Sequence, residues 1–244
     1  MITAFLSAVQ FLTVVPLKIK DTGEKRMAGS LVYFPLVGLL IGLSLAGINN
    51  LLFFLNFNIF AISIITVVAL IVITGGLHLD GLCDTADAFL SSKPKEEMLN
   101  IMRDPHTGVM GILSLISIIL LKISFLSSIN IPLRPTALVL MCVLSRWSAV
   151  WTMFLFPYAR QEGKAKVFIQ GMNLKIFMLS SIAALILAFV IWGLRGLLAL
   201  FIIAACSYLS GKIITRRIGG LTGDTLGANI ELTEIIVLLI VCIG

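Results

Sequence analysis

The sequence predicts an all-α, polytopic transmembrane helical bundle of about seven spans, and three observations support this prediction. Hydrophobic residues make up 59% of the 244 residues and charged residues only 12%, roughly half the charged share of a soluble domain. Apolar stretches close to the roughly 20 residues that cross a bilayer recur along the chain. Charge is concentrated between those stretches. With so little polar sequence, we expect a single integral-membrane domain over residues 1–244.

The apolar stretches give the expected spans in chain order. The last one, Ile235–Ile243, reaches spanning length only if its helix begins near Asp224. The first segment, Met1–Leu17, is either an interfacial helix or another span, since it lacks the basic start and cleavage site of a removed signal peptide. The remaining expected spans are Leu31–Leu55, Ile59–Leu77, Gly108–Ile129, Leu133–Phe156, Ile176–Trp192 and Gly196–Gly211.

Most of the eighteen Lys and Arg residues fall in four connections, and each consecutive pair of these connections is separated by two apolar segments. Two crossings return the chain to the same side, so the four connections share one face. The positive-inside rule makes that face cytoplasmic and the protein a multi-pass component of the cell membrane. The net charge of +6 then follows from topology and requires no nucleic-acid partner. The four connections are Lys18–Arg26, His78–His106, Tyr158–Lys175 and Lys212–Leu226.

Three aspartates share one helical face within Gly-Gly-Leu-His-Leu-Asp-Gly-Leu-Cys-Asp-Thr-Ala-Asp, residues 75–87. Asp80, Asp84 and Asp87 are spaced i, i+4 and i+7, so their carboxylates fall within about 60° of each other. The glycine pair lets the preceding span end or bend. A helix dipole explains an acid at the helix start but fades before Asp87. Like charges this close require a cation, and oxygen ligands favour a hard ion such as Mg²⁺.

A second motif, Ile-Met-Arg-Asp-Pro-His-Thr-Gly-Val-Met-Gly, covers residues 101–111 and leads into an expected span. Arg103 can clamp a phosphate with two hydrogen bonds, and Asp104 can add an oxygen ligand. The alternative is an ordinary loop with an internal Arg–Asp pair and an incidental His106. Its location on the same face as the aspartates favours the functional interpretation.

A third motif, Gly-Gly-Leu-Thr-Gly-Asp-Thr-Leu-Gly-Ala-Asn-Ile-Glu-Leu-Thr-Glu, covers residues 219–234. Its glycine amides can approach a phosphate closely. If a helix begins at Asp224, then Asp224, Glu231 and Glu234 fall within about 80° of each other and form a second acidic face. Gly227 leaves room for a neighbouring helix. The alternative is a capped helix start followed by two glutamates near the interface.

Two basic residues, Lys122 and Arg146, lie inside expected spans. A buried cation there would either pair with an acidic cluster or bind phosphate, and Lys122 could instead snorkel to the interface. The four cysteines are scattered without a C-x-x-C pair, so we expect them to be packing residues. With only two histidines in the chain, a zinc site is not expected.

Taken in order, the three motifs resemble the cobalamin synthase family, the adenosylcobinamide-GDP ribazoletransferases. Phe-Leu-Thr-Val-Val-Pro at 11–16 and Phe-Pro-Leu-Val-Gly-Leu-Leu-Ile-Gly at 34–42 also fit, so the likeness covers nearly the whole chain. Cys83 stands where we expect alanine in the family, a small apolar exchange. The resemblance implies a Mg²⁺-dependent transferase that joins adenosylcobinamide-GDP to α-ribazole, or its 5′-phosphate. The products would be adenosylcobalamin, or its 5′-phosphate, and GMP.

The resemblance also implies roles for individual residues. The expected metal ligands are Asp80, Asp84, Asp87 and Asp224, with Asp104 as a further catalytic acid nearby. One carboxylate would accept the proton of the attacking ribazole hydroxyl. Membrane lipid is an expected partner, and a homo-oligomer is left open. The residues expected to bind substrate or phosphate are His78, Arg103, Arg146, Gly223, Asp224 and Glu231.

Two other functions would also place acids on membrane helices. A CDP-alcohol phosphotransferase carries Asp-x-x-Asp-Gly-x-x-Ala-Arg, whereas this chain has Asp-Gly-x-x-Asp-x-x-Asp without that arginine. A cation or solute carrier would place its acids in mid-span. Here the acids are expected at helix ends, and the mid-span charges are basic.

Overall fold

The computed structural model describes residues 2–17 and 23–244, and this part of the chain is built from helices. Lys18 and Lys20 of the first basic connection, and Met1, lie outside the described residues. The prediction of an all-helical bundle is confirmed. The α-helices are α1 (Ile2–Leu12), α2 (Glu24–Ser30), α3 (Phe34–Phe54), α4 (Ile59–Thr74), α5 (Leu77–Leu90), α6 (Lys95–Ile101), α7 (Val109–Ser128), α8 (Arg134–Leu155), α9 (Lys164–Gln170), α10 (Leu174–Ile218) and α11 (Gly223–Ile243), with short 3₁₀ turns η1 (Leu31–Tyr33) and η2 (Ile131–Leu133).

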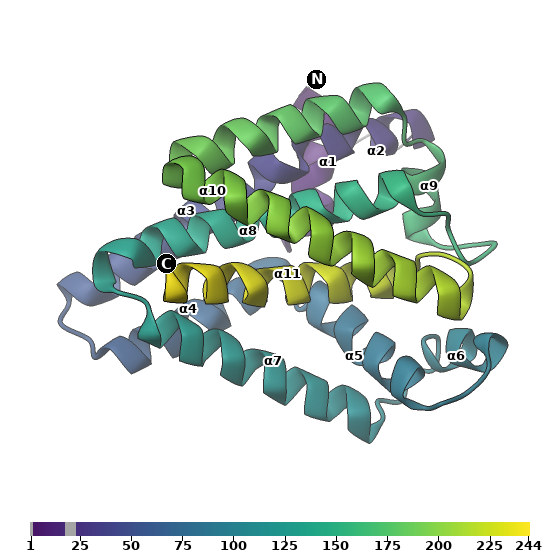
Figure 1. Ribbon diagram of the computed structural model, residues 1–244, viewed down its shortest axis with the longest axis horizontal. Helices are drawn as coiled ribbons and strands as arrows, with labels where there is room; N and C mark the ends of the chain where they lie inside the picture. Colours follow the sequence, from purple (N-terminus) through teal and green to yellow (C-terminus); the bar gives the residue numbers. More distant parts are fainter. Residues whose placement is uncertain (1, 18–22) are drawn as a thin grey trace.

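Five described helices are long and apolar enough to cross a membrane, or six if α4 and α5 form one bent span, so the chain is a membrane protein. The helix α10 has 45 residues, about 68 Å at 1.5 Å per residue, which is twice a bilayer core. Its backbone leaves helical geometry at Trp192 and Gly193, and Figure 1 shows it folding back into two arms. These arms correspond to the two spans expected there, and they account for the larger expected number of about seven. By contrast, α1 has 11 residues and is shorter than a span.

The centre of the bundle is formed by α8 and α11. Figure 1 shows α11 crossing the middle of the molecule, where it contacts α5, α7, α8 and α10. Most of α8 is buried, whereas most of the apolar surface of α10 is exposed. A Cβ on Gly38 would lie 2.3 Å from the carbonyl oxygen of Cys142, and one on Gly42 would lie 2.6 Å from the Cα of Val139. These two glycines therefore let the backbones of α3 and α8 touch, as small residues do in membrane helices.

The bend expected at the glycine pair is present. Gly75 and Gly76 both adopt left-handed conformations, with φ of 65° and 69°, which glycine reaches without a steric penalty. The chain turns by 91° between α4 and α5. As a result, α5 packs on α7 and α11 and carries its aspartates at the end of the bundle. The helix α11 begins at Gly223, as its spanning length requires.

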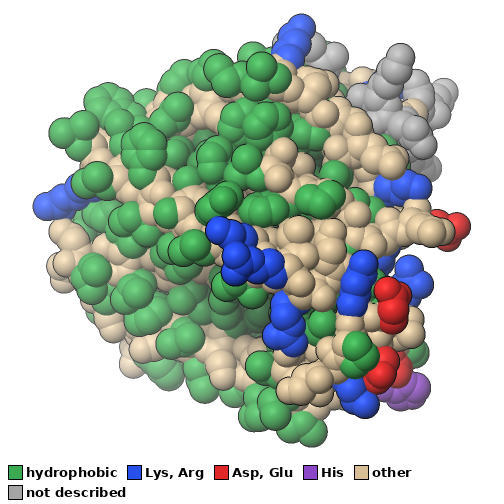
Figure 2. All heavy atoms as spheres, turned by 45° about the vertical axis from the view of Figure 1, so that its right-hand side comes forward, with side chains coloured by type: hydrophobic (Ala, Val, Ile, Leu, Met, Phe, Trp, Pro, Cys, Tyr) green, Lys and Arg blue, Asp and Glu red, His purple; other side chains and the backbone are tan. Residues whose placement is uncertain are grey.

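The two ends of the molecule differ in their content of charged side chains. Figure 1 shows the connections α5–α6–α7, α8–α9–α10 and α10–α11 at one end, and α3–α4, α7–α8 and the break in α10 at the other. Figure 2 shows charged side chains gathered toward the first of these ends, with hydrophobic side chains over most of the remaining visible face. The three described basic connections thus share one face, as the alternation of loops predicts.

Candidate active site

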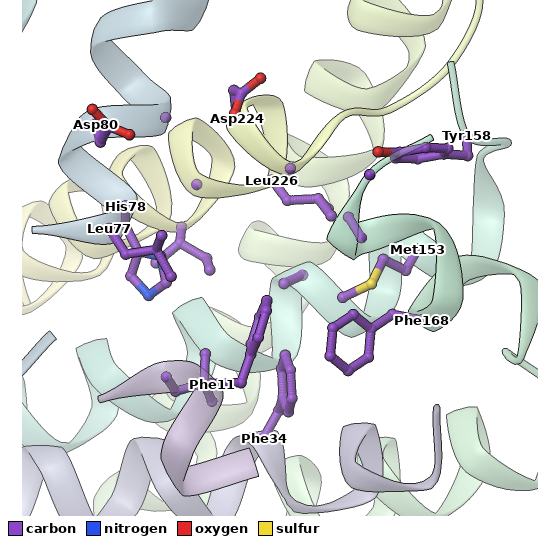
Figure 3. A pocket seen from close by; sticks show the side chains of 18 of the residues that line it. Phe11, Phe34, Leu77, His78, Asp80, Met153, Tyr158, Phe168, Asp224 and Leu226 are labelled. Carbon is purple, nitrogen blue, oxygen red and sulfur yellow. The ribbon is translucent and has the colours of Figure 1, made fainter. Parts of the chain in front are cut away.

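A cavity of about 240 Å³ opens at the charged end, between α5, α11, the α8–α9 connection and the short helices α1 and α9. Its charged lining residues are Asp80, Arg160 and Asp224. Figure 3 shows Asp80 and Asp224 on one side of the cavity and Phe11 and Phe34 on the opposite side. The volume is below the roughly 300–1,000 Å³ of a pocket for a whole drug-sized molecule. The cavity can therefore enclose only part of a large substrate.

Two glycines bring the aspartates of α5 and α11 to this opening. A Cβ on Gly81 would lie 2.7 Å from the backbone oxygen of Asp224, and a Cβ on Gly227 would lie 3.1 Å from that of His78. The helix backbones are therefore in direct contact. The negative charges of Asp80 and Asp224 both act on Asp84, whose side chain is partly buried. Acids from the first and third motifs thus share one opening.

Arg160 was not identified from the sequence as a site residue, yet it lines the cavity. Its Nη2 lies 2.8 Å from Oδ2 of Asp224, and its Nε has no hydrogen-bond partner among the described residues. The segment that carries it is fixed by two backbone hydrogen bonds, from the Ala159 amide to Leu221 (2.8 Å) and from the Leu221 amide to Pro157 (2.7 Å). The α8–α9 connection is thus attached to the glycine-rich turn before α11.

The same connection places a phenol at the cavity. Burial raises the pKa of Tyr158, the positive charges of Arg160 and Arg103 lower it, and the charge of Asp224 raises it. The net shift is upward, so the hydroxyl stays protonated at neutral pH, and it donates a hydrogen bond to the backbone oxygen of Glu162 (3.3 Å). Arg103 itself is exposed, and its charge reaches Tyr158. The guanidinium of the second motif is therefore accessible, although no residue of this motif lines the cavity.

Asp87 holds two helices together. Its two carboxylate oxygens accept hydrogen bonds from the amides of Gly108 (2.7 Å) and Gly111 (2.8 Å) at the start of α7. A Cβ on Gly108 would lie 2.3 Å from a carboxylate oxygen, so any other residue there would displace the Asp87 carboxylate. These contacts satisfy amides that a helix start leaves unpaired. Asp87 was expected as a metal ligand, and the structure gives it an anchoring role between α5 and α7.

Asp104 lies away from the cavity lining. Its carboxylate accepts a hydrogen bond from the His106 amide (2.9 Å) and pairs with Nδ1 of His106 (2.6 Å), and both side chains are exposed. These hydrogen bonds from His106 lower the pKa of Asp104. The structure thus places Asp104 in a contact with His106 inside the loop, whereas the alternative considered for this motif was an Arg–Asp pair with an incidental His106.

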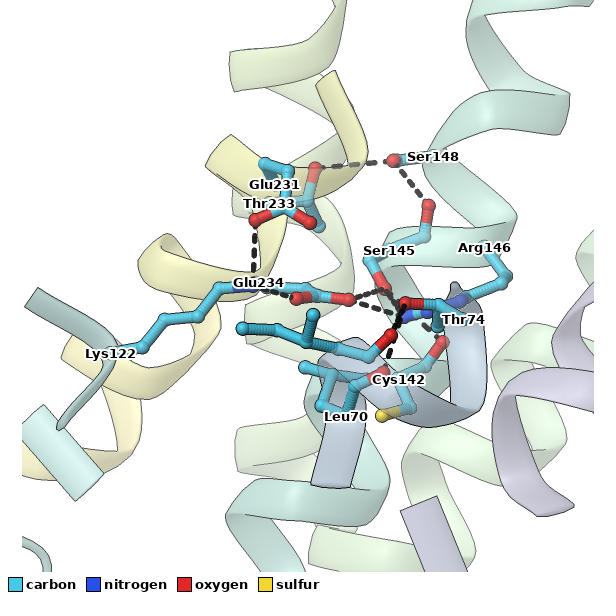
Figure 4. Close-up of polar contacts among 11 residues, drawn as sticks. Leu70, Thr74, Lys122, Cys142, Ser145, Arg146, Ser148, Glu231, Thr233 and Glu234 are labelled. Atoms are coloured by element: carbon cyan, nitrogen blue, oxygen red, sulfur yellow. Dashed lines mark hydrogen bonds and ion pairs between the residues drawn. The ribbon is translucent and has the colours of Figure 1, made fainter. Parts of the chain in front are cut away.

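The glutamates of α11 do not join the aspartates. Glu231 pairs with Lys122 at 2.7 Å, and Glu234 pairs with both Lys122 and Arg146. Figure 4 shows Glu234 between the two basic side chains, and each of the four residues is at most 4% exposed. Arg146 and Glu231 were expected to bind substrate. Instead, Arg146 pairs with Glu234 and Glu231 pairs with Lys122 inside the bundle, and neither residue lines the cavity. The expectation that buried cations pair with an acidic cluster is confirmed, and the cluster consists of the two glutamates of α11.

The remaining expected site residues divide into four that line the cavity and two, Asp84 and Arg103, that are not among its lining residues. Asp80, His78, Gly223 and Asp224 all line it. In the described part of the chain, no three acidic, histidine or cysteine side chains converge closely enough to form a metal-ligand group. The negative charges of Asp80, Asp84 and Asp224 act on one another. The positive charge of Arg160 compensates only part of this repulsion. Oxygen donors of this kind suit a hard divalent cation, so the Mg²⁺ site stays a prediction.

Known proteins resemble this chain over nearly its whole length. The sequence profile of the family described as Cobalamin-5-phosphate synthase matches residues 4–242. A protein of Desulforamulus reducens named Adenosylcobinamide-GDP ribazoletransferase is 34% identical over 244 residues, which is 100% of this chain and 98% of that protein. A Roseiflexus sp. protein of the same name is 39% identical over 235 residues, 95% of this chain and 86% of that protein. No solved structure matches the chain. The chain therefore belongs to the cobalamin-5-phosphate synthase family and is an enzyme.

Proposed function

We propose that this enzyme joins adenosylcobinamide-GDP to α-ribazole at the opening of the cavity and releases GMP. The observation that carries the proposal is the meeting of Asp80, Asp224 and Arg160 around one opening, in a chain whose relatives are named for this reaction. Acidic and basic groups placed together suit the transfer of a phosphorylated group. The family description also supports α-ribazole 5′-phosphate as an alternative acceptor, and both acceptors belong in the test.

The proposed step exchanges one phosphorus–oxygen bond for another. A ribose hydroxyl of the acceptor attacks the phosphorus attached to cobinamide, and the bond from that phosphorus to the bridging oxygen breaks. GMP leaves with the bridging oxygen. Asp80, which is exposed at the opening, is placed to accept the hydroxyl proton. Arg160, with its free Nε, and the exposed Arg103 are placed to bind phosphate oxygens.

We also propose that the enzyme uses Mg²⁺, held by Asp84 and Asp224, which leaves Asp80 to accept the hydroxyl proton. When bound, the ion would neutralise charge on the diphosphate oxygens. The support is electrostatic, because these carboxylates repel each other and Arg160 pairs with only one of them. Asp87 is left to anchor α7. For the location, we propose the cell membrane with the charged end in the cytoplasm, where the positive-inside rule places it.

The direct test uses the purified protein in liposomes with adenosylcobinamide-GDP, Mg²⁺ and either acceptor, assayed for GMP and for the cobalamin product. We expect equal amounts of both. Asp84→Asn should abolish turnover and weaken Mn²⁺ binding measured by electron paramagnetic resonance. The exposed Glu96→Gln on α6 is the matched control and should behave like the wild type. Wild-type turnover and Mn²⁺ binding by Asp84→Asn would refute the metal assignment. Consumption of a CDP-activated lipid without cobalamin formation would refute the proposed reaction.

A further inference from the structure

The inner part of the cavity has an aromatic wall assembled from three separate helices. Phe11 on α1, Phe34 on α3 and Phe168 on α9 all line it. The ring centroids of Phe11 and Phe168 are 4.6 Å apart, and those of Phe11 and Phe34 are 6.0 Å apart with nearly parallel planes. Aliphatic side chains, among them Leu226 and Ile230, complete the lining. Stacked rings and aliphatic groups suit a flat, mostly apolar ring system.

One polar side chain lies in this apolar part without a partner. His78 lines the cavity, is only 4% exposed, and its Nε2 has no hydrogen-bond partner among the residues described. The charges of Arg146, Glu234 and Lys122 act on its ring, yet none of them forms a hydrogen bond with it. Buried polar atoms are nearly always hydrogen-bonded in folded proteins. The ring lies in the cavity wall with its Nε2 shielded from the open space, so a bound molecule becomes the missing partner once the ring turns toward it.

We infer that this inner part binds the benzimidazole base of the acceptor nucleoside, and that His78 hydrogen-bonds the base's free ring nitrogen. The inference rests on the proposed function. A benzimidazole base is flat, bicyclic and mostly apolar, and one ring nitrogen is free to accept a hydrogen bond. With its hydrogen on Nε2, the His78 imidazole can donate that bond.

The other parts of the two substrates fit this space less well. A corrin macrocycle is too large for about 240 Å³. Guanine carries several donors and acceptors, which an aromatic and aliphatic wall would leave unpaired. With the base seated against Phe11 and Phe34, the ribose hydroxyls reach toward Asp80 and Asp224, which lie on the opposite side of the cavity in Figure 3. This places the attacking hydroxyl beside the groups proposed to act on the diphosphate.

The test compares two acceptors that differ only in the ring nitrogen: a benzimidazole nucleoside and its indole counterpart. Binding to the purified wild-type protein, without donor, is measured by calorimetry. We expect the benzimidazole nucleoside to bind about tenfold more tightly, because the indole leaves the buried imidazole unpaired. His78→Ala should bind both nucleosides equally, and His78→Gln, which keeps an N–H donor, should restore part of the preference. Equal binding of the two nucleosides by the wild type would overturn the inference even if no variant folds.

Steady-state kinetics separate this site from the donor site. Phe168→Leu should raise the KM for the acceptor and leave the KM for adenosylcobinamide-GDP unchanged. Phe60→Leu, at an exposed position on α4, is the matched control and should change neither value. A raised donor KM with an unchanged acceptor KM would assign the cavity to guanine and refute the inference. Absence of any cobalamin product from the wild type would instead refute the proposed function, so the two failures are distinguishable.

Discussion

Removing Lys122 should destabilise the bundle strongly, because it is shared by two buried carboxylates. Glu231 has no other ion-pair partner among the described residues, and both side chains are at most 5% exposed. Two unit charges 4 Å apart interact by about 4 kcal/mol at an effective dielectric constant of 20. Breaking a buried pair by deleting one partner costs about 3–5 kcal/mol. We therefore expect Lys122→Met to lose about 3–5 kcal/mol of unfolding free energy.

The assay is reversible unfolding in mixed micelles, followed by circular dichroism as denaturing detergent is added. The double variant Lys122→Met/Glu231→Gln removes the orphaned charge and should recover more than half of the loss. Lys175→Met, at an exposed position on α10, is the control and should unfold like the wild type. The reasoning fails if Lys122→Met is as stable as the wild type, or if the double variant is no more stable than the single one.

Three further predictions concern the site. Gly81→Ala would place a methyl group 2.7 Å from the backbone oxygen of Asp224 and push α5 from α11, so kcat/KM should fall by about 10²-fold in initial-rate assays while the protein stays folded. Asp87→Ala removes the acceptors for two amides at the start of α7, and thermal unfolding should show a loss of about 0.5–2 kcal/mol. Arg160→Lys keeps the charge but loses the planar guanidinium, so the donor KM should rise more than the acceptor KM; the opposite ratio would place Arg160 in the acceptor site.

Much of the fold could be predicted because local sequence determines it. The lengths of the apolar stretches predict the spans. The glycine pair at 75–76 predicts the bend before α5, because glycine adopts a left-handed backbone conformation without a steric penalty. The start of α11 follows from the length that a span requires. The proximity of Asp80 and Asp224 follows from two motifs lying on the same face. Each of these features depends on residues that are neighbours in the chain or on the side of the membrane they reach.

The remaining features depend on contacts between distant segments, which spacing along a single sequence does not encode. Arg160 reaches the site because its loop pairs with the turn before α11. The helical wheel correctly placed Glu231 and Glu234 on one face of α11, but only tertiary packing sets Lys122 and Arg146 against them. For the same reason, the sequence did not indicate that Phe11, Phe34 and Phe168, which lie on three separate helices, line one cavity.

One side of the cavity is stiff, and the opposite side is formed by two short helices. On the stiff side, α5 and α11 touch backbone to backbone at Gly81, and α5 is secured to α7 through Asp87, so neither helix can shift without disrupting several contacts at once. On the opposite side, α1 and α9 have only 11 and 7 residues, and they contribute mainly Phe11 and Phe168 to the cavity wall. The wall that carries Phe11 and Phe168 is therefore easier to alter than the side that carries the carboxylates. Engineering of base preference belongs on that wall, where the carboxylates are left undisturbed.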